Sequence, residues 1–288
     1  MAQIMELGRF YDPRWNVTRE GLVDRREGLL HLAEESILAA DPRIGGQTCE
    51  LAALVPLPCV QASLMVGAAL NYVDHAAEAN LKPPVAPLLF GIAPGALLGD
   101  GGELPFPTAA DLAFGLTEPY VDPEAELVAV IGAEGQIVGY AAGNDVSERT
   151  WQSAVGARGL PWLFPDSIGG QYECAWFKSL AGFKPLGSLY RGDIDPKNIR
   201  VQMLVNGQVV QDGNTRDMIF SVEQLAAETA RLLHLERLPA GTCIYTGTPP
   251  GIGYQPYHPE RGRPSLKPGD VMTVQLSFGA VTTHIVAR

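Results

Sequence analysis

The chain has 288 residues, 46% of them hydrophobic and 18% charged, so it can bury a sizeable core and does not have the composition of a disordered protein. Its formal net charge of −11 argues against nucleic acid and anionic membranes as main partners. No apolar run approaches the roughly 18 residues of a membrane span, and the N-terminus lacks the basic start and apolar core of a signal peptide. We therefore expect a cytoplasmic protein that binds neither nucleic acid nor membranes.

Residues 1–60 are expected to form a small N-terminal domain ahead of a main domain over 61–288. Within the first part, Asn16–Ala39 carries leucines and an isoleucine among charges at helical spacing. This pattern predicts a helix, which Thr18 would cap.

The main domain is predicted to be mostly β with a few helices, an α+β fold. Short apolar runs bounded by turn residues predict its strands, at Leu64–Leu70, Leu127–Ile131, Ile137–Ala141, Val201–Val205, Cys243–Thr246, Val271–Leu276 and Val281–Val286. Asn206-Gly207 is a strong hairpin signal, and Ser221–His234 is an amphipathic helix that Ser221 can cap.

The four cysteines, Cys49, Cys59, Cys174 and Cys243, form no CxxC pair and do not lie beside a histidine at zinc-ligand spacing. We expect reduced and mostly buried thiols.

Two glutamates, Glu124 and Glu126, stand two residues apart on a predicted strand. Because successive side chains of a strand alternate between its faces, both project to the same side. A hairpin closed at Gly132–Gly135 would bring Asp145 to within a residue or two of opposing Glu124. The spacing therefore predicts three carboxylates at one end of an apolar ribbon.

Carboxylates this close repel one another, more strongly when they are buried, and a cation is the ordinary remedy. Because only oxygen ligands are available, a hard cation is expected: Mg²⁺, Mn²⁺ or Ca²⁺. The alternative is a solvated acidic strand end, and the pattern alone leaves both open. A structure in which the oxygens point apart, or in which lysine or arginine fills the space between them, would contradict the metal site.

Two further segments follow predicted strands. If Asn71–Glu78 opens a helix, His75 and Glu78 lie at i and i+3 and can touch, and a carboxylate that orients a histidine suits a general base. The alternative is a surface pair. The glycine-rich loop Thr246–Gly253 could hold a carboxylate or an oxyanion with its amides and a threonine hydroxyl, or it could be a plain tight loop.

The chain resembles the fumarylacetoacetate hydrolase family over about residues 64–286. The resemblance is carried, in this order, by NYVDHAAE, VDPEAELVAVIG, GYAAGNDVSERTWQ, WFKS, VNGQVVQ, NTRDMIFSV, TGTPPGIG and LKPGD. It implies a mixed β-roll fold, usually a homodimer, and one divalent cation per subunit, commonly Mg²⁺ or Mn²⁺. It also implies small-molecule substrates that are 2-oxo or 1,3-diketo acids.

The resemblance also implies roles for single residues. Matched by position, the metal ligands of the family fall on Glu124, Glu126 and Asp145, and its water-activating dyad falls on His75 and Glu78. Its substrate-contacting glutamine, active-site lysine and substrate-binding positions fall on Gln152, Lys178, Thr248, Gly247 and Tyr72. The segment 153–177 is longer than is usual in the family, and we expect it to shape the substrate pocket or a dimer contact.

These residues favour a metal-dependent hydrolase that cleaves a carbon–carbon bond in an acylpyruvate-type 1,3-diketo acid, with His75 activating water. The alternative is a lyase on a 2-oxo acid, either an oxaloacetate decarboxylase or a dehydratase or tautomerase of a 3-deoxy-2-oxo sugar acid. A third possibility, a catalytically silent binding or scaffold protein, is disfavoured because the ligand set, the dyad and Lys178 are all present.

Overall fold

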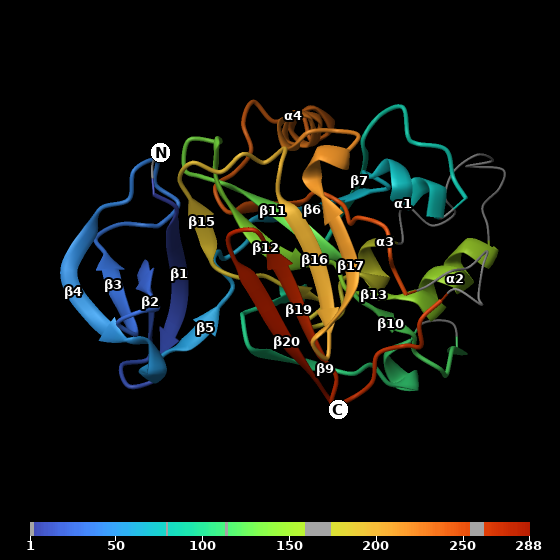
Figure 1. Cartoon of the computed structure of the whole chain (residues 1–288), viewed down its shortest axis with the longest axis horizontal. Coiled ribbons are helices and arrows are strands. Elements are labelled where there is room, and N and C mark those ends of the chain that lie inside the picture. The colour runs from blue at the N-terminus through green and yellow to red at the C-terminus, as the bar shows by residue number, and fades with distance from the viewer. Residues whose placement is uncertain (1–2, 79, 113–114, 159–173, 254–261) are drawn as a thin grey trace.

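The computed structural model describes residues 3–78, 80–112, 115–158, 174–253 and 262–288. It is an α+β fold built mostly of strands, as the sequence predicts, in which a large sheet and a smaller sheet pack face to face (Figure 1). The helices are short and lie at the margins of these sheets (Figure 1).

The large sheet has eleven strands in the order β4-β3-β2-β1-β15-β12-β11-β18-β6-β7, with β5 paired to β1. Its strands are β1 (Met5–Asp12), β2 (Val17–Asp24), β3 (Leu29–Ala33), β4 (Ile44–Glu50), β5 (Val55–Leu57), β6 (Leu64–Ala69), β7 (Leu88–Gly91), β11 (Ala125–Ile131), β12 (Ile137–Asn144), β15 (Leu189–Arg191) and β18 (Thr242–Tyr245).

The smaller sheet has five strands in the order β17-β16-β19-β20-β9. They are β9 (Gly102–Pro105), β16 (Arg200–Val205), β17 (Gln208–Asn214), β19 (Val271–Leu276) and β20 (Ala280–Val286). Two further pairs are β10 (Val121–Asp122) with β13 (Ser147–Glu148), and β8 (Leu97–Leu98) with β14 (Lys184–Pro185).

The helices are α1 (Val73–Glu78), α2 (Arg149–Arg158), α3 (Cys174–Phe177) and α4 (Val222–Leu232). In the part of the chain that the structure describes, no helix combines the length and the apolar character needed to cross a membrane.

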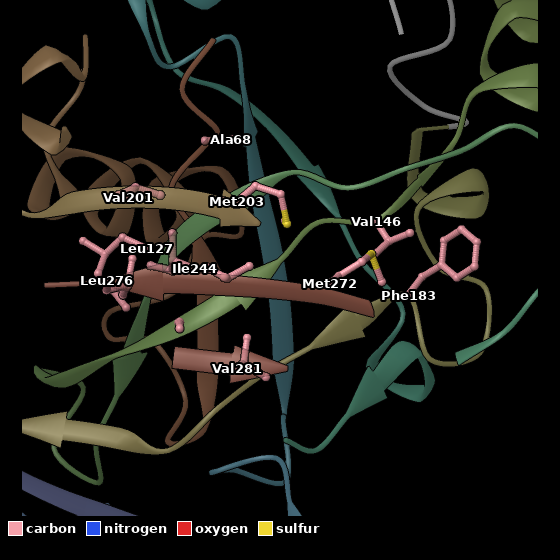
Figure 2. Packing of buried hydrophobic residues seen from close by; sticks show 14 of the residues in the cluster. Ala68, Leu127, Val146, Phe183, Val201, Met203, Ile244, Met272, Leu276 and Val281 are labelled. Atoms are coloured by element: carbon pink, nitrogen blue, oxygen red, sulfur yellow. The ribbon is translucent and has the colours of Figure 1, made fainter. Parts of the chain in front are cut away.

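The main hydrophobic core lies between the two sheets (Figure 2). Leu127 and Ile244 contribute to it from the large sheet, and Met203 and Val274 from the smaller one. Strand β11 is buried along its whole length, because its other face packs on a second cluster that contains Val128. A fully buried aliphatic side chain contributes about 1.5–3 kcal/mol, so this strand is a rigid base for the residues at its ends.

Two local predictions are confirmed. Asn206 and Gly207 adopt positive φ angles of 52° and 79° and join β16 to β17, as a two-residue hairpin turn requires. Helix α4 begins after Ser221, whose hydroxyl accepts a hydrogen bond from the Gln224 amide.

The prediction of a helix over Asn16–Ala39 is wrong. This segment forms β2 and β3, joined by a turn at 25–28 in which Gly28 has a φ of +71°. The Asp24 carboxylate accepts the amides of Arg26 and Glu27, which closes the turn. The leucine spacing fitted a helix, but pairing with β1 and β4 in the sheet decided the structure. Thr18, the predicted cap, lies within β2.

The N-terminal strands belong to the same sheet as the rest of the chain, since β1 pairs with β15 from Met5 to Leu7. They also have a small cluster of their own that contains Phe10, Val23, Leu30 and Leu54. The domain boundary at residue 60 stays a prediction.

Candidate active site

Three carboxylates meet where β11 begins and β12 ends. Glu124 precedes β11, Glu126 lies within it, and Asp145 follows β12. Ala125 pairs with Asn144, and the Asp145 amide donates to the Glu124 carbonyl at 2.9 Å, so the hairpin extends to the cluster. All three side chains are buried, and each offers an oxygen within 4.8 Å of the other two. The predicted convergence is confirmed.

Cations neutralise part of this cluster. Lys178 Nζ lies 2.7 Å from Glu124 Oε2, 2.7 Å from Asp145 Oδ2 and 2.8 Å from Ser147 Oγ. The lysine thus fills part of the space between two of the carboxylates, which is the arrangement that counts against a metal site. It also lies 5.5 Å from the centroid of the Phe90 ring.

Of the three carboxylates, Glu126 is the one without a cationic partner among the described residues. In the described residues no lysine or arginine forms an ion pair with it, and its Oε2 accepts the Gly247 amide at 2.8 Å. Burial raises the pKa of Glu126, and the charges of Asp145 and Glu124 raise it further. The cluster therefore still lacks positive charge at this side chain.

The neighbouring charges follow the same logic. Burial opposes ionisation of Glu124, but Lys178 and Arg149 outweigh it and hold the pKa of Glu124 below its usual range. Burial also opposes the charge of Lys178, yet Asp145 and Glu124 keep the pKa of Lys178 above its usual range.

Three charged residues around the carboxylates were not assigned from the sequence. Arg149 donates to Asp122 and to Glu124 Oε1, and Lys184 Nζ lies 2.7 Å from Asp145 Oδ1 in an ion pair that lacks hydrogen-bond geometry. Burial lowers the pKa of Lys184 to about 8, against the attraction of Asp145. A lone lysine within an apolar stretch, Gly182–Gly187, was the available signal for Lys184.

The predicted dyad is formed. His75 and Glu78 lie on α1, with His75 Nδ1 3.2 Å from Glu78 Oε2, and His75 is only 7% exposed. The Gly251 amide donates to both oxygens of Glu78, at 2.9 and 3.1 Å, which ties the helix to the glycine-rich loop. His75 lies close enough to Glu124 to interact with it electrostatically, so the dyad is near the carboxylate cluster.

The glycine-rich loop closes over β11. Gly247 has a φ of +94°, and a Cβ there would lie 2.8 Å from that of Asn71, so glycine is required. Thr248 Oγ1 donates to the Ala125 carbonyl and accepts from Gln211, which leaves it one lone pair. The structure thus brings Gly247 and Thr248 to the cluster.

Tyr72 interacts electrostatically with Glu126, and Gln152 contacts Arg149, a partner of Glu124. The Tyr72 side chain is buried, and its hydroxyl has no hydrogen-bond partner in the residues that the structure describes. Burial raises the pKa of Tyr72, and the charge of Glu126 adds to the effect. Gln152 Oε1 accepts from Arg149 Nη1 at 2.8 Å. The functional roles of these residues stay predictions.

Two remaining expectations concern the long segment and the thiols. Most of 153–177, expected to shape the pocket or a dimer contact, lies outside the described residues. Cys49, Cys59 and Cys243 are free thiols, the last two of them buried.

Known proteins resemble this chain along most of its length. The model of the fumarylacetoacetate (FAA) hydrolase C-terminal family matches residues 64–286. The mitochondrial oxaloacetate tautomerase fahd2 of Xenopus laevis is 30% identical, over 96% of this chain and 81% of its own length. The human mitochondrial oxaloacetate tautomerase FAHD2A is 29% identical, over 96% of this chain and 82% of its own.

A solved structure shares the whole fold. The 5-carboxymethyl-2-hydroxymuconate delta-isomerase of Mycobacterium smegmatis has a TM-score of 0.74 and 26% identity, covering 99% of this chain and 100% of that one. The names of the two tautomerases place those proteins in mitochondria, whereas the cytoplasmic location and the homodimer expected here stay predictions.

Proposed function

Because the chain belongs to the fumarylacetoacetate hydrolase family, we propose that it is a divalent-metal enzyme that interconverts the keto and enol forms of a small 2-oxo acid of the oxaloacetate type. The observation that carries this proposal is a buried cluster of three carboxylates, one of them without a cationic partner among the described residues, with a His–Glu dyad near it.

The donor set fits a hard cation. Glu124, Glu126 and Asp145 supply carboxylate oxygens, and carboxylates are ligands that Mg²⁺ and Mn²⁺ prefer. Lys178 bonds two of these three side chains, so an arriving ion competes with its ammonium group for the same oxygens. Among the described residues, the Lys178 ammonium group bonds only to side chains, and we expect it to give way to the ion.

The bound cation would supply positive charge to the carboxylate and keto oxygens of the 2-oxo acid as an enolate develops. His75 does the proton transfer. Its Nδ1 is held by Glu78, which leaves Nε2 to take a proton from C3 and to return it when the keto form is restored. The keto oxygen gains a proton as the enol forms and loses it as the keto form is restored, with the Lys178 ammonium group as the proton donor and its amine as the acceptor, so the charge of the substrate is unchanged overall.

Names of relatives favour proton transfer over bond cleavage. Two relatives that match nearly the whole chain are called oxaloacetate tautomerases, and the solved neighbour is called an isomerase. This order differs from the sequence-based expectation, which placed carbon–carbon hydrolysis first.

Hydrolysis of an acylpyruvate is the second candidate, and the dyad favours it. A buried histidine oriented by a carboxylate can deprotonate water as well as carbon. The two reactions share the enolate and differ in whether water enters the site.

One experiment separates the candidates. The protein is stripped with a chelator, reloaded with Mg²⁺ or Mn²⁺ and mixed with oxaloacetate enol or with acetylpyruvate. We expect metal-dependent loss of the enol absorbance without release of pyruvate, which a lactate dehydrogenase assay would detect. Release of pyruvate from oxaloacetate would assign a decarboxylase, and loss of acetylpyruvate alone would assign the hydrolase. No metal-dependent change in any assay would refute the proposal.

A further inference from the structure

A second buried lysine stands behind the carboxylate cluster. Lys184 lies on β14, is fully buried, and donates to the backbone carbonyls of Val146 at 3.2 Å and Phe183 at 3.1 Å. Its Nζ is 2.7 Å from Asp145 Oδ1. In the part of the chain that the structure describes, the Lys178 ammonium group bonds only to side chains, whereas two main-chain carbonyls hold Lys184 in place.

The same arrangement recurs at each of the three carboxylates. One oxygen of each meets a group that is fixed by the fold: Glu124 Oε1 accepts a hydrogen bond from Arg149, Glu126 Oε2 accepts one from the Gly247 amide, and Asp145 Oδ1 forms an ion pair with Lys184. Each side chain is left with one further oxygen to offer. In Asp145 this is Oδ2, whose one hydrogen-bond partner among the described residues is Lys178.

Carboxylates that offer one oxygen each suit some cations better than others. Mg²⁺ requires near-octahedral geometry with few protein oxygens and keeps several waters. Ca²⁺ takes six to eight oxygens and often binds a carboxylate through both. A carboxylate whose second oxygen is already occupied cannot bind an ion through both oxygens. This arrangement therefore weakens the binding of Ca²⁺ more than that of Mg²⁺.

We propose that Lys184 is a positioning residue that makes Asp145 a one-oxygen ligand and so sets the preference of this centre for Mg²⁺ or Mn²⁺ over Ca²⁺. The inference rests on the proposed metal centre and adds its selectivity. Of these three groups, Lys184 is the one that a substitution can test most directly, because Gly247 donates from its backbone and Arg149 also bonds Asp122.

The test measures binding of Mn²⁺ alone and of Ca²⁺ alone to the chelator-stripped full chain by titration calorimetry, with the Mn²⁺ spectrum followed by electron paramagnetic resonance. In the wild type we expect Mn²⁺ to bind at least roughly tenfold more tightly than Ca²⁺. In Lys184→Met the ratio of the Ca²⁺ dissociation constant to the Mn²⁺ dissociation constant should fall by about tenfold. Neighbours of metal ligands commonly have effects of this size.

The matched control is Lys267→Met. Lys267 also lies 2.8 Å from an aspartate, Asp270, but its side chain is 74% exposed and outside the site. It should leave the ratio unchanged. Lys184→Arg, which keeps the charge, should restore the wild-type preference. A purely structural role for Lys184 would change both affinities alike.

The outcomes are distinct. If the wild type binds neither ion, the proposed metal centre fails and this inference fails with it. If the wild type binds Mn²⁺ and the ratio in Lys184→Met equals that of the wild type, only the role of Lys184 is refuted. If Lys184→Met does not fold, the wild type decides, because Ca²⁺ binding as tight as Mn²⁺ binding overturns the inference.

Discussion

Two regions of one sheet use their charges in different ways. At the N-terminal end, Arg25 and Glu6 form an ion pair in which the arginine side chain is 58% exposed. Where β11 begins and β12 ends, carboxylates and cations are almost wholly buried. Water screens the first pair, so it does little beyond local contact. The second group cannot be screened, and its members set the pKa values of one another.

The largest difference between the buried charges and the exposed pair is expected at Glu126. Glu126→Gln removes the negative charge that no lysine or arginine neutralises, and with it one ligand. We expect metal-dependent turnover to fall by about 10³-fold or more, because the cation contributes several kcal/mol to charge stabilisation. Turnover and Mn²⁺ binding are the measurements, with circular dichroism to show that the fold is kept. Activity at the wild-type level would remove Glu126 from the ligand set.

His75→Ala tests the dyad near the cluster. The rate should fall by roughly 10²–10⁴, as expected for loss of a general base, while Mn²⁺ affinity stays within a few-fold of the wild type. Steady-state kinetics and calorimetry report the two quantities separately. An unchanged rate would show that another group moves the proton.

Lys178→Met tests whether the lysine and the ion compete. Removing the ammonium group should tighten Mn²⁺ binding, because two carboxylates lose their internal partner, while the rate falls by about 10²-fold through loss of a donor to the developing charge. Opposite signs in calorimetry and kinetics are the expected signature. Weaker Mn²⁺ binding in the variant would contradict competition.

The pH dependence of metal binding follows from the raised pKa of Glu126. Protons compete with the cation for this carboxylate, so Mn²⁺ affinity should fall as pH drops through that pKa. In the metal-free protein the sign is reversed for stability: a carboxyl whose pKa is raised on folding favours the folded state below its unfolded pKa, and this contribution is lost as pH rises through the folded pKa. Titrations across pH should show both trends, and Glu126→Gln should weaken both.

The smallest effect is expected at the exposed pair. Arg25→Ala should lower the free energy of unfolding by less than about 1 kcal/mol, since salt bridges at the surface are weak. Turnover should be unchanged. Denaturant unfolding and a standard assay are sufficient, and a large loss in either would show that the N-terminal strands are coupled to the site.

Local patterns were reliable where one element determines the outcome. The placement of Glu124 and Glu126 on one face, the hairpin that returns Asp145, and the turn at Asn206-Gly207 all follow from strand alternation and turn chemistry. The failure over Asn16–Ala39 has the same origin, because leucines at that spacing satisfy a helix as well as two short paired strands, and partner strands decided between them.

The sequence by itself determined which acidic groups converge and, through its resemblance to one family, the histidine and the lysine that accompany them. Only the tertiary structure decided how their charge is divided: Arg149 on one oxygen of Glu124, Lys184 on one oxygen of Asp145, and Glu126 without a cation among the described residues. Periodicity reports the face on which a side chain lies, whereas the identity of its buried neighbours depends on how separate elements pack, and that packing sets the energy of a buried charge.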